Sequence, residues 1–125
     1  MIELAGVAAN GVRGHIGLTA DAPVPAIQEF AKRFKARFNY VNDHNGIKGY
    51  TAVYMIKAVT EKIGKFDPKL FAQTLHGMTI KPEQEPGILM EASWDANGDI
   101  DRASFLAEIV DGKQKIVEIL PKLNK

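Results

Sequence analysis

The sequence contains no cysteine, which excludes disulfide bonds, thiol catalysis and thiolate metal sites. It also lacks a charge imbalance, because 16 basic and 15 acidic residues leave a net charge of +1. There is therefore no electrostatic case for binding nucleic acid or an anionic membrane. No run of residues reaches the roughly 18 apolar residues of a membrane span. Residues 1–10 lack the basic stretch and apolar core of a secretory signal, so an export signal would lie on sequence outside this chain.

Patterns for catalysis and metal binding are equally scarce. The serines Ser93 and Ser104 lie outside any Gly-x-Ser-x-Gly elbow. The histidines His15, His44 and His76 share no metal-ligand spacing. We therefore expect no catalytic residue, no metal site and no cofactor, and a function other than that of an enzyme.

The acidic stretch at residues 95–101 resembles the start of a calcium loop. Such a loop needs glycine at its sixth position and glutamate at its twelfth, where this sequence has Ile100 and Leu106. A hairpin turn is the favoured interpretation.

What the sequence does contain is a series of amphipathic elements. A strand is expected at 12–18, followed by a helix from Pro25, since proline suits the first helical turn. Ile27, Phe30 and Phe34 follow the helical period. The opposite face carries a basic cluster, for which a solvated surface is favoured over an anion site; its members are Lys32, Arg33, Lys35 and Arg37.

A second helix is expected at 47–63 and ends at Gly64, and a third begins at Asp67-Pro68. The second helix is apolar on several sides, which is typical of a helix covered by several neighbours. The chain provides few such neighbours. We therefore expect either that strands from sequence outside this chain cover the helix, or that copies of the chain associate.

The last third changes to a period of two. Residues 87–94 and 105–110 alternate between apolar and polar side chains, as strands do. Asp111-Gly112 suits a tight hairpin, with a return strand at 116–120. The predicted fold is α/β: a strand, three helices, then a β-hairpin or meander.

Several segments, in this order, resemble the leucine/isoleucine/valine-binding family of periplasmic solute-binding proteins. They are residues 4–14, the Gly-Tyr-Thr-Ala-Val-Tyr of 49–54 with 56–58, residues 70–77, residues 87–99 and residues 105–113. The similarity covers nearly all of this chain and would match about the final third of a typical family member.

The resemblance implies an incomplete part of a two-lobed type I periplasmic binding fold, whose lobes close over a ligand. Residues 1–18 would end the second lobe, 19–86 would form the helical part of the first lobe, and 87–125 would return to the second. Residues 18–25 and 81–89 would then be crossings between lobes.

The resemblance also places a ligand contact in the loop before the tyrosine-bearing helix. At that position stand His44, Asn45 and Gly46, with Tyr50 following. Asn45 replaces an aromatic residue of the leucine binders, and a plain Asn-Gly turn is the alternative interpretation.

The implied function is that of the solute-binding component of an ABC-type importer, located in the periplasm. Its expected partners are an amino acid or related small carboxylated solute and a membrane permease. The chain alone is expected to bind solute weakly or not at all, because two-lobed sites depend on enclosure by both walls. The isolated fragment is also expected to form a homo-oligomer or a domain-swapped dimer. The alternative function is that of a stand-alone oligomerising interaction module without a ligand.

Overall fold

The computed structural model describes residues 2–124 and shows a mixed α/β chain. Its helices are α1 (Ile2–Ala5), α2 (Pro25–Phe38), α3 (His44–Ile63) and α4 (Pro68–Leu75), with 3-10 turns η1 (Gly6–Ala9) and η2 (Pro86–Ile88). Its strands are β1 (Arg13–Ile16), β2 (Thr79–Ile80), β3 (Ala92–Trp94), β4 (Ile100–Asp101), β5 (Ser104–Val110) and β6 (Lys113–Leu120). The predicted order of a strand, three helices and then strands is confirmed.

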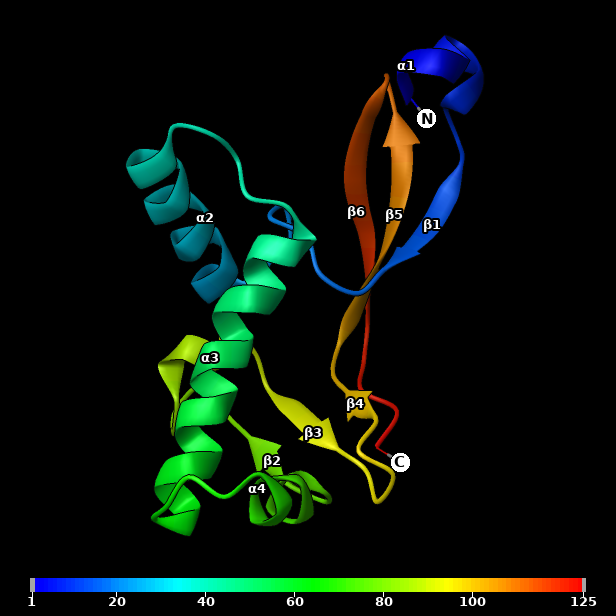
Figure 1. Cartoon of the computed structure of the whole chain (residues 1–125). Helices are drawn as coiled ribbons and strands as arrows, with labels where there is room; N and C mark the ends of the chain where they lie inside the picture. The colour runs from blue at the N-terminus through cyan, green and yellow to red at the C-terminus, as the bar shows by residue number, and fades with distance from the viewer. Residues whose placement is uncertain (1, 125) are drawn as a thin grey trace.

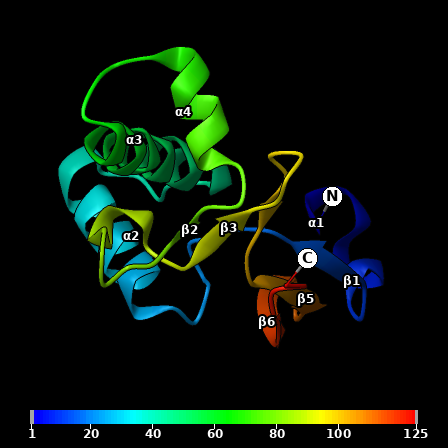
Figure 2. The ribbon, with the colours of Figure 1, turned by 90° about the horizontal axis from the view of Figure 1, so that it is seen from below.

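The elements form two groups (Figure 1). Helices α2, α3 and α4 lie together with β2 and β3, while β1, β5 and β6 form a separate sheet; the view from below shows the same division (Figure 2). That sheet has the order β1-β5-β6, and the smaller sheet has the order β2-β3-β4. Residues 17–24, between β1 and α2, and residues 102–103, between β4 and β5, connect the two groups.

The larger sheet is antiparallel and is centred on β5. Asp111 and Gly112 join β5 to β6 with φ values of 51° and 70°, the left-handed pair that a two-residue hairpin requires. This confirms the predicted Asp-Gly turn. A register shift lies between Leu106 and Ala107 in β5.

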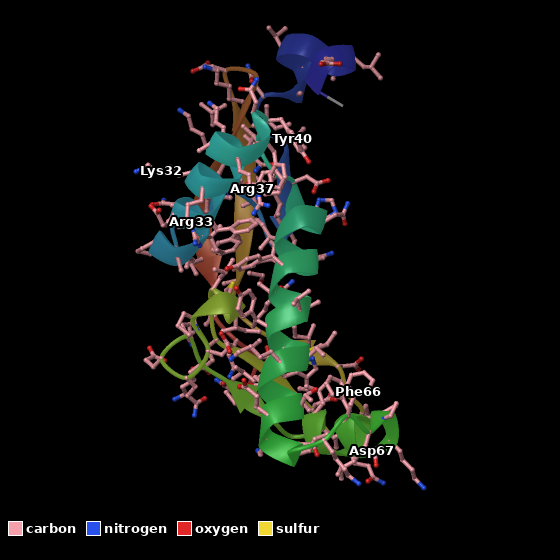
Figure 3. All side chains as sticks on the ribbon, turned by 60° about the vertical axis from the view of Figure 1, so that its left-hand side comes forward. Lys32, Arg33, Arg37, Tyr40, Phe66 and Asp67 are labelled. Atoms are coloured by element: carbon pink, nitrogen blue, oxygen red, sulfur yellow. The ribbon has the colours of Figure 1, made fainter. Side chains whose placement is uncertain are left out.

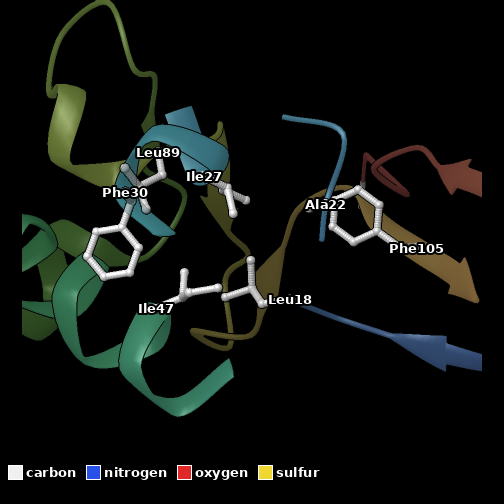
Figure 4. Packing of buried hydrophobic residues seen from close by; sticks show 7 residues of the cluster. All are labelled: Leu18, Ala22, Ile27, Phe30, Ile47, Leu89 and Phe105. Carbon is white, nitrogen blue, oxygen red and sulfur yellow. The ribbon is translucent and has the colours of Figure 1, made fainter. Parts of the chain in front are cut away.

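Two apolar cores hold the chain together. The first contains Leu18, Ala22, Ile27, Phe30, Ile47, Leu89 and Phe105. Figure 4 shows Phe105 of β5 beside Ala22 of the connecting segment, so this core joins the sheet to the helices. The second core packs α3 against the smaller sheet through Val59, Ile80, Ile88, Ala92 and Trp94.

Helix α3 begins three residues before the predicted start at Ile47. The Asp43 carboxylate accepts a hydrogen bond from the backbone N–H of Gly46 at 2.9 Å, which satisfies one of the free donors of the first turn. The helix ends at Gly64 with φ 70°, as predicted. The predicted start of α4 is also confirmed, because the Asp67 carboxylate accepts from the Leu70 N–H at 3.0 Å.

The predicted strand at 87–94 is wrong over its first half. Only Ala92–Trp94 is a strand, and Pro86–Ile88 is a 3-10 turn followed by Leu89 at φ 64°. Ile88 and Leu89 are both buried, in different cores. The apparent alternation thus comes from a turn that inserts consecutive side chains into two cores, and not from one face of a sheet.

The outer face of α3 remains exposed among the described residues. Ile47, Thr51 and Val59 are buried, whereas Val53 is 64% exposed and Ile56 is 43% exposed. The described chain therefore leaves the side of the helix that carries Val53 and Ile56 uncovered, as the sequence predicts for a helix that needs further neighbours.

Candidate functional site

A cavity of about 450 Å³ lies between α3 and the segment that links β3 to β4. Its walls are Leu18, Ile47, Lys48, Thr51, Ala52, Met55, Ile88, Leu89, Met90, Ala92, Trp94, Gly98, Asp99, Ile100 and Arg102. The size falls within the range of small-molecule sites, roughly 300–1,000 Å³.

One stripe of α3 forms a wall of the cavity. Lys48, Thr51 and Met55 are spaced by three and four residues, which places them on one helix face. His44 precedes Lys48 by four residues and continues this stripe toward the N-terminus of the helix. The predicted ligand residue His44 therefore lies on the same helix face as the residues of α3 that line the cavity.

Three charged side chains, those of Lys48, Asp99 and Arg102, line a mostly apolar cavity. Arg102 is half-buried, and burial lowers the pKa of its guanidinium. A Cβ on Gly17 would lie 3.9 Å from its Nη2 atom, so the guanidinium lies against the connecting segment that leaves β1. Lys48 and Asp99 are more exposed. With two cations and one carboxylate, the cavity lining has an excess of one positive charge.

The predicted ligand residues His44, Asn45 and Gly46 lie in the first turn of α3 and not in the preceding loop. The Asn45 side-chain amide donates to Asp43 Oδ2 at 3.4 Å. The pKa of Asp43 is lowered, chiefly because its carboxylate accepts from the Gly46 backbone N–H. His44 and Asn45 are exposed, so both side chains are accessible to a solute.

Tyr50 lies on a different side of α3. Its ring packs 4.6 Å from that of Phe30 on α2 and 4.8 Å from that of Tyr54, measured between ring centroids. It belongs to the contact between α2 and α3 and does not line the cavity.

Sequence reasoning did not select Lys48, Trp94 or Arg102. Lys48 could have been found from its spacing of four residues from His44. Arg102 carried no such signal, because its place at the cavity depends on how the chain returns from β3 to β5.

The basic cluster of α2 is exposed, as the favoured interpretation requires. Figure 3 shows Lys32 and Arg33 along α2, and the Arg37 guanidinium lies 5.3 Å from the centre of the Phe38 ring. At the other end of α3, Phe66 and Asp67 stand beside α4 (Figure 3).

An ion pair anchors the turn at η2. Lys57 Nζ lies 2.6 Å from Glu85 Oε2, and the Glu85 side chain is only 8% exposed. Glu85 also accepts from the Gly87 N–H at 3.2 Å. The hydrogen bond from Lys57 lowers the pKa of Glu85. These contacts fix the wall of the cavity that contains Ile88 and Leu89.

Within residues 2–124, no three acidic or histidine side chains gather as metal ligands would. The helices described for this part of the chain are all too short or too polar to cross a membrane.

Residues 1–114 match the family model described as periplasmic binding protein. The chain belongs to the periplasmic binding protein family. Members of this family are binding proteins and not enzymes. No curated protein sequence matches the chain.

Solved structures of periplasmic binding proteins share its fold. A periplasmic binding protein from Burkholderia mallei has a TM-score of 0.77 and 14% identity, covering 98% of this chain and 34% of its own. A leucine binding protein from Thermotoga maritima has a TM-score of 0.73 and 18% identity, covering 96% and 33%. A solute-binding protein of an ABC transporter from R. palustris, in complex with benzoate, has a TM-score of 0.70 and 20% identity, covering 98% and 33%. The chain thus spans about a third of the length of each.

Proposed function

We propose that this chain serves as part of the solute-binding component of an ABC-type importer, and that the solute is an amino acid or another small carboxylated molecule. The observation that carries the proposal is the family match over residues 1–114. The names of similar structures agree with it, since one is a leucine binding protein and another holds benzoate. The finer assignment to the branched-chain amino acid binders belongs to the same proposal.

The division into lobes is part of the proposal. Residues 1–18 and the end of the chain would belong to one lobe, and the helices to the other. Pairing of β3 with β2 and of β4 with β3 favours keeping residues 92–101 with the helices, so that the return crossing would follow β4 instead of lying at the expected residues 81–89. The periplasm and a membrane permease are the proposed location and partner.

For the site, we propose that solute approaches the first turn of α3. The exposed His44 and Asn45 support this placement, and the shared stripe with Lys48 favours His44. Tyr50 would act indirectly, by packing α3 against α2.

A thermal-shift screen against amino acids and aromatic acids tests the function. A ligand at a hundredfold excess over its Kd stabilises a protein by about 2.7 kcal/mol, so a true solute raises Tm clearly in the full-length protein that contains both lobes. The chain of 125 residues alone is expected to respond weakly. Absence of any shift in the full-length protein across both classes would contradict the proposal.

A stand-alone oligomerising module is the second candidate. The exposed Val53 and Ile56 on α3, with Phe66 at 81% exposure, favour it. Sedimentation of the isolated chain tests this second candidate, because a monomer at every concentration would remove its support.

A further inference from the structure

We propose that the cavity between α3 and the β3–β4 segment binds a small monocarboxylic acid with an apolar body, and that Arg102 and Lys48 bind its carboxylate. This inference rests on the proposed function and names the class of solute and its contacts. It moves the centre of the site from the helix start to the cavity beside it.

Arg102 is the main argument for an anion. Its guanidinium is half-buried, and among residues 2–124 it lies in no ion pair. Burial is the cause of its lowered pKa. A partly buried cation without a counter-ion is unfavourable, and a carboxylate that accepts two parallel N–H bonds from the guanidinium removes that cost.

Lys48 provides a second cation at the same cavity. It lies on the α3 stripe, and among the described residues it also lies in no ion pair. Asp99 offsets one of the two charges. One remaining positive charge suits a monocarboxylate better than a dicarboxylate.

The remaining walls favour an apolar body for the ligand. Trp94, Met55 and Leu89 are among the large apolar side chains that line the cavity. Trp94 is 7% exposed, so most of its side chain packs within the second core. A flat or branched apolar group placed here would leave water and contact the Trp94 side chain.

The position of Trp94 provides a direct probe, because it is the only tryptophan in the sequence. Its indole N–H gives one resolved NMR resonance that reports on the cavity wall. Benzoate is titrated into the 125-residue protein, with benzamide as a neutral ligand of nearly the same shape. We expect benzoate to shift the indole resonance with a Kd on the order of 1 mM, and benzamide to bind at least tenfold more weakly.

Variants then test the two cations. Arg102→Met is expected to weaken benzoate binding at least tenfold, and Lys48→Met several-fold. Arg33→Met is the matched control, since Arg33 is an exposed arginine on α2 that does not line the cavity, and it should bind as the unaltered chain does. Because Lys48 is exposed, its variant remains informative even if Arg102→Met fails to fold.

Three results would overturn the site. They are equal shifts with benzoate and benzamide, unchanged binding in both cation variants, and no shift of the indole resonance at about ten times the expected Kd. A solute found by the thermal-shift screen that leaves the Trp94 resonance unmoved removes this site but keeps the proposed function. If neither the thermal-shift screen nor the NMR titration shows binding, both the proposed site and the proposed function are contradicted.

Discussion

Gly87 shows how tightly the turn at η2 is fitted beneath α3. A Cβ atom at this position would overlap the ring of Tyr54, and the Gly87 N–H donates to the buried Glu85 carboxylate. The glycine is therefore required by space and not by backbone conformation. Sequence reasoning predicted a strand here, because nothing local to residues 87–94 reveals the aromatic ring that arrives from α3.

We expect Gly87→Ala to lower the free energy of unfolding by about 1–3 kcal/mol, the usual cost of overpacking. Urea denaturation followed by circular dichroism measures it. Gly49→Ala is the matched control: Gly49 lies in α3 with no atom within 4 Å of an added Cβ. That substitution should stabilise the chain by about 0.5–1 kcal/mol. Equal effects of the two changes would contradict the role given to Tyr54.

The pair of Lys57 and Glu85 predicts how stability depends on pH. The folded state holds the pKa of Glu85 below its ordinary value of 4.5, mainly through the hydrogen bond from Lys57. A carboxyl group whose pKa is lower in the folded state stabilises that state at pH values above its unfolded-state pKa. This stabilisation is lost as the pH falls through the folded-state pKa. The Lys122 hydrogen bond lowers the pKa of Glu91 in the same direction.

We therefore expect Glu85→Gln to be less stable than the unaltered chain at neutral pH, with the difference shrinking steadily below pH 4.5. Urea midpoints measured between neutral and acidic pH follow this. Glu83→Gln, an exposed residue of the same turn, should keep the original pH profile. A constant difference between the Glu85 variant and the unaltered chain at all pH values would argue against the ion pair.

For the individual helices and strands, sequence reasoning predicted the structure correctly where one or two residues determine the backbone conformation. Asp111-Gly112, Gly64 and Asp67-Pro68 each specify a turn or a helix end through φ or a capping oxygen. The start of α3 could have been predicted in the same way, from Asp43 three residues before Gly46. The turn at η2 and the position of Arg102 could not, because both depend on contacts between elements distant in the sequence.

Substitution of Gly112 tests whether the β5–β6 hairpin depends on the backbone geometry of its turn. At φ 70° and with no atom within 4 Å of an added Cβ, its replacement by alanine acts through the backbone alone. We expect Gly112→Ala to cost about 1 kcal/mol in thermal or urea unfolding. Gly14→Ala, in β1, is equally free of neighbours and has no positive φ, so it should cost little. A similar loss at both positions would show that the turn does not depend on left-handed geometry.

At the scale of the whole molecule, the sequence anticipated that α3 has more apolar surface than the chain covers. In the structure, Val53 is 64% exposed and Ile56 is 43% exposed, so apolar side chains of α3 do remain uncovered. The exposed face is the feature that the two candidate functions explain differently. Strands from outside this sequence would cover it in a two-lobed receptor, and a second copy would cover it in an oligomer.

We expect the isolated chain to self-associate in a concentration-dependent way in sedimentation velocity. Val53→Glu should shift the chain toward monomer without unfolding it, because Val53 contributes little to either core. Lys62→Glu, an exposed position near the end of the same helix, is the control for added negative charge. A monomer at every concentration would contradict self-association and would remove the support for an oligomerising module.

The cavity is bounded by residues from different parts of the chain. Leu18 and Arg102 lie in or beside the two connections to the sheet, whereas Lys48 and Met55 belong to α3. A change in the angle between sheet and helices would therefore alter the spacing of the two cations. By thermodynamic reciprocity, an anion that bridges them would bias that angle. Binding of the anion in the cavity would then be detectable as a change in the hydrodynamic shape of the whole molecule.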